Sequence, residues 1–534
     1  MPVLDWIGKR QVINHDKEVP FRLLKRVDSL SVGKSENLII KGDNLEALKA
    51  LLPYYYNKVK CIYIDPPYNT GNEDWIYNDK VNSPEIKRWL GKVVGSEGED
   101  LSRHDKWLCM MYPRLKLLRE LLRDDGVIFV SIDDDEQHHL RMMMSEIFGA
   151  ENFVTNIIWQ KKFSPQNDAK YFSDMHDFIV VYAKHRNYGS ETIGWIRNLL
   201  PRTEAMDERY SNPDKDPRGD WTSSDLTAKR VTPEDIYPIR NPSGKVIYPT
   251  KGRSWSISKE RFKELVGDNR IWFGENGNNV PRLKRFKTDV QEGIVPVTIW
   301  FHPEVGHNQE AKQIVKQILP DADMPFQTPK PVRLIKRIIQ ISCDKDDIIL
   351  DSFAGSGTTA HAVLELNKED GGNRKFILVE MEEEIVRKVT AERVKRVIKG
   401  YLYKNNKGED IKVEGLGGGF QFMNLDTELF NAHGLINDDI GYTDLARYIF
   451  FSETRLDLRE KAMEDYFIGE NKDIEYYLVY KKDKKNVLNR KIISTLKKTG
   501  RQKIVYADSC TLDAEILAGL NITFKQIPYE VRGF

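Results

Sequence analysis

The chain has 534 residues, of which 40% are hydrophobic and 31% charged, and its formal net charge at pH 7 is +1. This length exceeds that of one typical domain, and no apolar run reaches the roughly 20 residues of a membrane-spanning helix. The near-neutral charge argues against a general polyanion binder, so any nucleic-acid surface must be local. Residues 161–290 carry a net charge of roughly +6, which suggests such a surface, although scattered solvated charges would give the same count.

The cysteines and the start of the chain favour a cytoplasmic protein. Cys61, Cys109, Cys343 and Cys510 lie far apart without a C-x-x-C pair, so we expect buried free thiols rather than a zinc cluster or a disulfide framework. The first residues lack the basic and continuously apolar segments of a signal peptide.

Strands and helices alternate in the first zone, residues 1–185. A short strand is predicted at 38–40, followed by a helix at 45–52 that Pro53 ends. Further strands are predicted at 60–64, 127–132, 156–159 and 177–182, and a helix at 114–122. Such alternation indicates an α/β protein with a parallel, doubly wound sheet.

A proline-rich motif ends the strand at 60–64. It consists of Asp65, Pro66, Pro67 and Tyr68, and we call it the DPPY segment. The amino group of adenine or cytosine is a poor nucleophile, but the Asp65 carboxylate and the Pro66 carbonyl can accept both of its hydrogens. Tyr68 can stack on a base that has been flipped out of a duplex. Alone, the motif could also be a plain proline turn.

The next cluster, residues 133–139, could suggest a metal site. It holds four consecutive acidic residues and two histidines, His138 and His139. Residues of this type after a strand usually cap a helix, so we expect no metal here.

The middle zone, residues 186–320, is rich in proline, glycine, asparagine, tryptophan and arginine, and reads as an insertion of irregular or mixed structure. Its basic run at 282–287 and its aromatic residues Trp221, Trp255 and Trp272 are candidates for DNA contacts. A solvated basic strand and core aromatics explain the same residues at least as well.

The α/β pattern resumes in residues 321–414, and a glycine-containing turn ends its first strand. A helix is predicted at 332–341, the strand at 347–350, a helix at 358–366 and a strand at 375–379 that ends at Glu380. We call the turn between the strand and the second helix the glycine turn; its residues are Phe353, Ala354, Gly355, Ser356, Gly357 and Thr358. Glycines let the backbone approach a ligand closely, and nucleotide-like ligands bind at the carboxyl ends of parallel strands. The turn lacks the third glycine of a dinucleotide motif and the lysine of a P-loop, which favours another adenosine-containing ligand.

Together these motifs resemble those of the amino-methyltransferases that modify DNA, and their order is that of the beta-class members. Further segments look like the modification (Mod) subunits of type III restriction–modification systems; they lie at 41–48, 176–184, 328–331 and 371–376. The resemblance implies a permuted, Rossmann-like methyltransferase sheet in residues 1–185 and 321–414, with residues 186–320 as a target-recognition domain. Residues 415–534 are expected to form a small accessory α/β domain.

The resemblance also implies the cofactor, S-adenosylmethionine, and the residues that bind it. The glycine turn, with Asp351 before it, would hold the methionine part of the cofactor. Asp43 and Asn44 would approach the adenine, Glu380 the ribose, and Lys330 with Pro331 would help to close the pocket. Without the family, Asp43 reads equally well as a helix cap and Lys330 as a surface salt bridge.

The function implied is methylation of adenine N6 in a specific duplex DNA sequence, with base flipping, within a restriction–modification or related epigenetic system. Double-stranded DNA, a second copy of the chain and a restriction (helicase–nuclease) subunit are the partners implied, although a stand-alone enzyme stays open. Three alternatives remain: a cytosine N4 enzyme, an RNA or protein methyltransferase, and a non-catalytic DNA-reading subunit.

Overall fold

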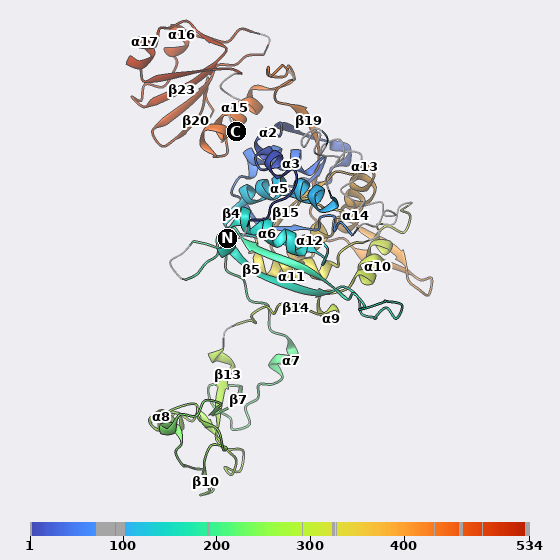
Figure 1. The fold of residues 1–534 in the computed structure, drawn as a ribbon, viewed down its shortest axis with the longest axis vertical. Coiled ribbons are helices and arrows are strands. Elements are labelled where there is room, and N and C mark those ends of the chain that lie inside the picture. Colours follow the sequence, from blue (N-terminus) through green and yellow to red (C-terminus); the bar gives the residue numbers. More distant parts are fainter. Residues whose placement is uncertain are drawn as a thin grey trace. The chain divides into compact units, whose positions relative to one another are not determined.

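The computed structural model describes residues 3–70, 91, 102–189, 193–290, 292–322, 326, 328–431, 433–458, 463–482 and 484–528. The chain forms two compact units (Figure 1). Unit 1 comprises Met1–Arg197 and Val297–Phe534, and unit 2 comprises Asn198–Pro296. Within the described ranges, no helix combines the length and the apolar character needed to cross a bilayer.

A ten-stranded sheet organises unit 1, with the strand order β1-β19-β2-β16-β15-β3-β4-β6-β5-β14. Its central strands are parallel to one another: β2 (Leu38–Lys41), β16 (Lys375–Glu380), β15 (Ile348–Asp351), β3 (Val59–Ile64) and β4 (Leu122–Ile132). This confirms the α/β fold class and the strand positions expected from the apolar runs.

The permuted chain order brings the two motifs together. Strand β15, from the second half of the sequence, lies beside β3 from the first half, with Ile349 opposite Cys61. Because parallel strands present their carboxyl ends at one edge, the DPPY segment after β3 and the glycine turn after β15 become neighbours. On the other side of β15, β16 pairs with β2, so that Glu380 lies opposite Lys41.

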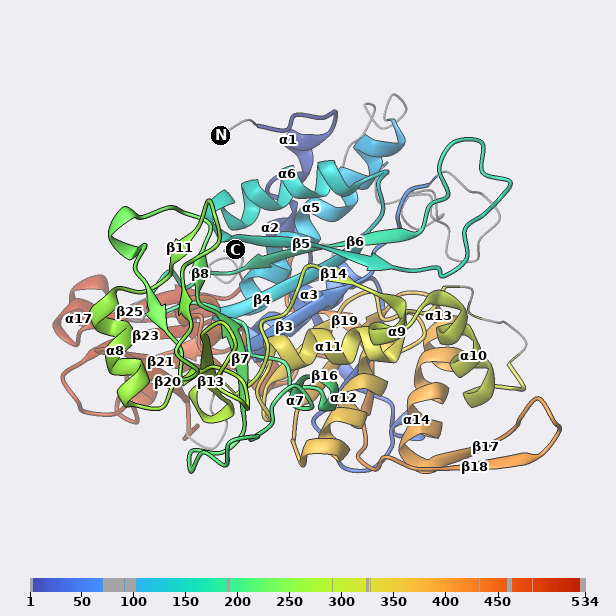
Figure 2. The ribbon, with the colours of Figure 1, turned by 90° about the horizontal axis from the view of Figure 1, so that it is seen from below.

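Helices cover both faces of this sheet (Figure 2). On one face α3 (Asn44–Tyr55) and α6 (Gln137–Phe148) flank α5 (Arg103–Leu121), and on the other α11 (Val332–Ser342) packs on α12 (Thr358–Asp370). Alternate residues of β3 and β4 point to the first face, where Ile62, Ile64 and Val130 join the core that these helices bury. Because side chains alternate along a strand, each of these strands packs against the helices on both faces of the sheet.

Two helix boundaries differ from the sequence prediction. Helix α3 does not end at Pro53 but continues to Tyr55, because a proline near the end of a helix forfeits only one backbone hydrogen bond there. Helix α5 begins at Arg103 rather than near residue 114, since Ser102 and Asp105 form a capping box at its start.

The sequence predicted a parallel sheet, but the sheet in the structure is mixed. Strand β6 (His176–Ala183) is antiparallel both to β4 and to β5 (Phe153–Gln160), and β14 (Ile299–Trp300) adds to β5 in parallel. The connection between β5 and β6 contains no helix in the structure, and without such a crossover two adjacent strands pair as an antiparallel hairpin.

The C-terminal residues contribute to the main sheet and form a second one. Strand β19 (Gln421–Glu428) lies between β2 and β1 (Arg22–Arg26). The second sheet contains β20 (Phe467–Asn471), β21 (Ile474–Leu478), β23 (Gln502–Ala507) and β25 (Ile522–Gln526). Helix α15 (Tyr442–Thr454) contacts both β20 and α3, so this region packs on the main body of unit 1.

Unit 2 has short strands and a small core of its own. Strands β7 (Trp221–Asp225), β13 (Arg282–Phe286) and β12 (Ile271–Trp272) form a three-stranded antiparallel sheet, and α8 (Lys259–Gly267) contributes Leu265 to the core. The remaining strands pair two by two.

Candidate active site

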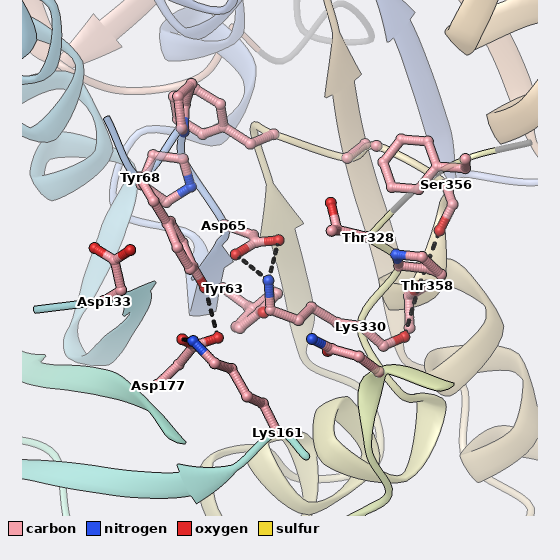
Figure 3. A pocket seen from close by; sticks show the side chains of 18 of the residues that line it. Tyr63, Asp65, Tyr68, Asp133, Lys161, Asp177, Thr328, Lys330, Ser356 and Thr358 are labelled. Carbon is pink, nitrogen blue, oxygen red and sulfur yellow. Dashed lines mark hydrogen bonds and ion pairs between the residues drawn. The ribbon is translucent and has the colours of Figure 1, made fainter. Parts of the chain in front are cut away.

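A cavity of about 340 Å³ lies at the carboxyl ends of β3 and β15 (Figure 3). It is lined by the whole DPPY segment and by Phe353, Ala354, Gly355, Ser356 and Thr358 of the glycine turn. The two motifs, which lie almost 300 residues apart in the sequence, thus form one site. Its size is within the usual range for small-molecule pockets.

Lys330 crosses this cavity and binds Asp65. The Lys330 ammonium donates to both carboxylate oxygens of Asp65, each at 2.5 Å, and lies 5.0 Å from the centre of the Tyr68 ring. Lys330 is buried, so the surface salt bridge considered from the sequence is not what forms. Its neighbour Pro331 precedes the first turn of α11 as its N-cap.

Tyr68 is held from the other side by a buried acid. Its hydroxyl donates to Asp177 Oδ2 at 3.4 Å, and the Lys161 ammonium binds Asp177 Oδ1 at 2.7 Å. Burial, with the nearby Asp177 and Asp65 carboxylates, raises the pKa of Tyr68 well above its ordinary value, which keeps the phenol neutral. A neutral Tyr68 ring is a suitable surface for stacking a base.

Two contacts fix the backbone around the DPPY segment. The Trp107 indole N–H donates to the Pro67 carbonyl at 2.7 Å. Asn69, which follows Tyr68, is fully buried with a positive φ of 61°, and its amide donates to Glu136 Oε1 at 2.5 Å. Helix α5 and the start of α6 therefore hold the segment on both sides.

The glycine turn has its own buried support. Gly357 adopts a left-handed conformation, with φ of 77°, as the N-cap of α12. The fully buried Arg393 of α14 (Glu392–Lys399) donates to the Ser356 carbonyl at 3.2 Å, to Ser356 Oγ at 2.7 Å and to Thr358 Oγ1 at 2.9 Å. Burial lowers the pKa of Arg393 to about 10.

Two further carboxyl groups with raised pKa values face the cavity. Burial raises the pKa of Asp351 to about 7, against opposing hydrogen bonds from Thr359 Oγ1 and the Phe353 N–H. Burial, together with the charge of Asp135, raises the pKa of Asp133 to about 7. Raised values of this kind are common at functional sites, where buried acids share a small space.

Asp43, Asn44 and Glu380 lie at the ends of β2 and β16, next to the glycine turn, but do not line this cavity. Asp43 caps α3 by accepting from the Leu45 N–H at 2.8 Å, as considered from the sequence, and also binds Arg114. Asn44 donates to the Ser352 carbonyl at 3.2 Å. The Glu380 carboxylate accepts from the Gly355 N–H at 2.9 Å. Their predicted contacts with adenine and ribose stay predictions.

The acidic and histidine cluster after β4 folds around Glu136. His104 Nδ1 lies 2.7 Å from Glu136 Oε1 and His139 Nδ1 lies 2.8 Å from Oε2, while the His138 ring packs at a tilt against His139. His104, Glu136 and His139 together could hold a metal ion. Their separations, however, are those of N–H···O hydrogen bonds, and tetrahedral zinc ligands with bonds of about 2.0 Å lie further apart.

In unit 2, the aromatic candidates serve mostly the core. Trp221 and Trp255 are buried, and Trp272 packs edge-on against Trp221. The basic run 282–287 alternates along β13, so that Arg282 and Arg285 are exposed while Lys284 is buried against Asp214 and Asp216. The exposed arginines therefore remain candidates for DNA contacts.

Several residues of the site were not predicted from the sequence. Lys161, Asp177 and Arg393 carry no motif of their own, and Asp133 was singled out only within the acidic cluster 133–139, not as a residue of this site. Asp177 lies in the segment 176–184 that resembles Mod subunits, and this was the one available signal for it. The others reach the site only through strand pairing and helix packing.

The fold and the residues of the site are those expected of an amino-methyltransferase of DNA, and a family comparison agrees. Residues 59–392, more than half of the chain, match the family model described as DNA methylase (N6_N4_Mtase), and the chain belongs to this family.

Particular relatives include Mod subunits of type III restriction–modification enzymes. The StyLTI Mod subunit of Salmonella typhimurium is 38% identical over 356 residues, which cover 64% of this chain and 52% of that protein. The EcoPI Mod subunit of Escherichia phage P1 is 33% identical, covering 72% of this chain and 64% of that protein. The type II methyltransferase M.KpnI of Klebsiella pneumoniae is also 33% identical, covering 64% and 79%. The predicted resemblance to Mod subunits is thus confirmed, although the chain spans only 52% and 64% of the two Mod subunits compared.

Proposed function

We propose that this chain transfers a methyl group from S-adenosylmethionine to the N6 amino group of adenine in a specific sequence of duplex DNA, with the target base flipped out. The observation that supports this most directly is the shared cavity: Asp65 and the glycine turn meet at the carboxyl ends of two adjacent strands.

The DPPY segment suits the acceptor amine. Its nitrogen becomes a better nucleophile when the Asp65 carboxylate and the Pro66 carbonyl accept both amino hydrogens and favour a pyramidal geometry. A carboxylate has about four lone-pair positions, so Asp65 can accept from the amine while it still binds Lys330. Lys330 and Lys161 balance the charges of Asp65 and Asp177, which would otherwise repel each other.

The glycine turn suits the cofactor. S-adenosylmethionine supplies a methyl group bound to a positively charged sulfur. Asp351 offers a carboxylate to the ammonium group of the methionine part, and Gly355 lets the backbone approach because it has no Cβ. Glu380, with Asp43 and Asn44 at the adjoining strand end, has the polar groups that ribose and adenine require.

The partners are also part of the proposal. Two of the relatives described above are Mod subunits of type III restriction–modification enzymes, so we propose that the chain acts within such a system and partners a restriction subunit. The homodimer that the family resemblance implies belongs to the same proposal. Residues 186–320, which include unit 2, would read the DNA sequence, and residues 415–534 would be an accessory domain.

The test is methyl transfer by Asp65→Ala. We expect this variant to lose transfer to DNA and to retain S-adenosylmethionine binding, measured by calorimetry, because Asp65 serves the acceptor side of the cavity. Asp438→Ala, which removes an exposed carboxylate in the C-terminal region, is the matched control and should behave as the wild type.

Mapping of modified bases in DNA from cells that express the chain gives the base and the sequence. N4-methylcytosine instead of N6-methyladenine would replace the proposed substrate by the cytosine alternative. Substantial methylation by Asp65→Ala would refute the assigned role of the DPPY segment. DNA binding without any transfer by the wild type would indicate a non-catalytic DNA-reading subunit.

A further inference from the structure

The connection between β5 and β6, residues 161–175, presents two aromatic rings to solvent. Tyr171 is 83% exposed and Phe172 is 95% exposed, which makes Phe172 the most exposed large apolar side chain in the described ranges. In Figure 2 this connection projects beyond the end of β5 and the start of β6. Isolated exposed apolar residues need no explanation, but two adjacent aromatic rings at the tip of a projecting connection indicate a binding surface.

The base of the same connection belongs to the candidate active site. Lys161, Lys162 and Asp174 all line the cavity. The Lys161 N–H donates to the Met175 carbonyl at 3.0 Å, and the Lys161 ammonium binds Asp174 at 2.6 Å. The two ends of the connection are thus joined at the cavity that would receive the target base.

The connection is also held by contacts of its own. The Gln166 N–H donates to Ser173 Oγ at 2.7 Å, across the loop. The Phe163 ring stacks on His302, with a centroid distance of 6.0 Å and an interplanar angle of 17°. The Phe163 ring therefore packs on His302 at the base of the connection, whereas Tyr171 and Phe172 lie at its tip.

The charges nearby favour DNA as the occupant. On the same connection Lys170 is exposed and Lys162 is half-buried, and the Lys170 ammonium lies 5.6 Å from the centre of the Tyr171 ring. Aromatic rings flanked by cations suit a nucleic acid, because the rings stack on bases and the cations approach phosphates. Continuity with the cavity places this surface where a duplex must lie if one of its bases enters the site.

We infer that Tyr171 and Phe172 insert into the base stack and fill the gap left by the extruded target base. This inference rests on the proposed function. Extrusion costs the stacking and pairing of the base, and an aromatic wedge recovers part of that cost by stacking on the bases that remain.

The experiment compares the wild type with the double variant Tyr171→Ala, Phe172→Ala on two duplexes that contain the mapped recognition sequence. One duplex is fully paired, and the other has a mismatch opposite the target base, which lowers the cost of extrusion. Leu520→Ala, which truncates an exposed apolar residue in the C-terminal region, is the control. Parallel measurements follow S-adenosylmethionine binding and the fluorescence of 2-aminopurine placed at the target position.

On the paired duplex we expect the double variant to lose about tenfold in kcat/KM, equivalent to about 1.4 kcal/mol, and to show a smaller rise in 2-aminopurine fluorescence. On the mismatched duplex its kcat/KM should return to within about twofold of the wild type, with cofactor binding unchanged throughout. The mismatch rescue is specific to a role in extrusion.

Two results would overturn the inference. If the double variant and the wild type have the same kcat/KM on the paired duplex, the rings do not act on DNA. An equal loss on both duplexes would assign them a structural role or a contact with another protein. Absence of transfer by the wild type itself, on either duplex, would instead refute the proposed function and with it the role of the wedge.

Discussion

At the scale of single residues, the candidate site confines several charges in a small volume. Asp65, Asp133, Asp177 and Asp351 line one cavity together with Lys161, Lys162 and Lys330. Lys330 and Lys161 bind Asp65 and Asp177 directly, whereas Asp351 accepts hydrogen bonds from two neutral donors, Thr359 Oγ1 and the Phe353 N–H. Ionisation of the buried Asp351 therefore opposes folding.

Asp351 should therefore make the protein less stable as pH rises. Burial raises its pKa from 3.8, the ordinary value of an aspartate, to about 7 in the folded protein, so between these values the folded state binds more protons than the unfolded state. The free energy of unfolding then falls as pH rises through this window and levels off above it. In Asp351→Asn this component disappears, and the variant gains up to a few kcal/mol relative to the wild type between about pH 4 and pH 7.

Urea unfolding of both proteins at a series of pH values measures this difference. Asp133, whose pKa is also about 7, titrates in both proteins and cancels in the comparison. A difference in stability that does not change with pH would contradict the raised pKa of Asp351.

The glycines offer a second residue-scale prediction, because two of them share a backbone conformation but not an environment. Gly355 has φ of +49° and an added Cβ would lie 2.8 Å from the Phe326 ring in the cavity, whereas Gly371 has φ of +68° and open space around it. Alanine at either position should cost about 1 kcal/mol of stability through backbone strain. Only Gly355→Ala should also weaken S-adenosylmethionine binding, by about tenfold, because its methyl group intrudes on the cavity.

Calorimetry of cofactor binding and chemical unfolding separate the two effects. Equal cofactor affinity in Gly355→Ala and Gly371→Ala would place the cofactor away from the glycine turn.

At the scale of elements, Glu136 connects the loop after the DPPY segment with two helices. Its buried carboxylate accepts from the Asn69 amide and lies within hydrogen-bond distance of His104 on α5 and His139 on α6. Glu136→Ala leaves the buried Asn69 amide and the two half-buried histidines without this acceptor, so we expect a loss of about 2 to 4 kcal/mol in the free energy of unfolding. A lower kcat should accompany it, because Asn69 directly follows Tyr68.

Asp134→Ala, which removes an exposed carboxylate of the same cluster, is the control and should change stability by less than about 0.5 kcal/mol. Elemental analysis adds an independent check. If the wild type binds a metal ion in a one-to-one ratio and Glu136→Ala loses it, the cluster is a metal site rather than a set of hydrogen bonds.

The elements also show which parts of the fold could be predicted from sequence. Strands β3 and β15 were predictable because continuous apolar runs ended by Asp65 and Asp351 are typical of buried parallel strands. The antiparallel pairing of β6 was not, since its apolar residues fit either direction equally well. The insertion of β19 between β1 and β2 joins strands that lie far apart in the sequence, and local sequence carries no signal for such a contact.

The same limit applies to the site. Asp65 and the glycine turn belong to contiguous motifs, so sequence alone identified them. Asp177 and Arg393 act through contacts with Tyr68 and Ser356, which exist only after distant elements have packed. Lys330 was predicted to lie in the site as a residue that closes the cofactor pocket, and its bond to Asp65 became visible only in the structure.

At the scale of the whole molecule, unit 1 carries unit 2 as an insertion, and the two ends of unit 2 meet. Within unit 2, the Leu200 N–H donates to the Ile294 carbonyl at 2.9 Å and the Ile294 N–H donates to the Leu200 carbonyl at 2.8 Å. Unit 2 also has a core of its own around Trp255 and Ile271. Insertions with adjacent ends and separate cores are tolerated because the host fold does not depend on them.

Replacement of residues 198–296 by a short glycine–serine linker should therefore leave unit 1 folded. We expect the shortened protein to bind S-adenosylmethionine with an affinity within about threefold of the full chain, since every residue that lines the cavity belongs to unit 1. Transfer to the mapped DNA sequence should be lost, because the groups that read the bases would be absent. A shortened protein carrying Gly355→Ala, with its weakened cofactor binding, provides the control that the cofactor signal comes from the site. Sequence-specific transfer by the shortened protein would show instead that unit 1 recognises the target by itself, and loss of cofactor binding would show that unit 2 supports the fold of the cavity.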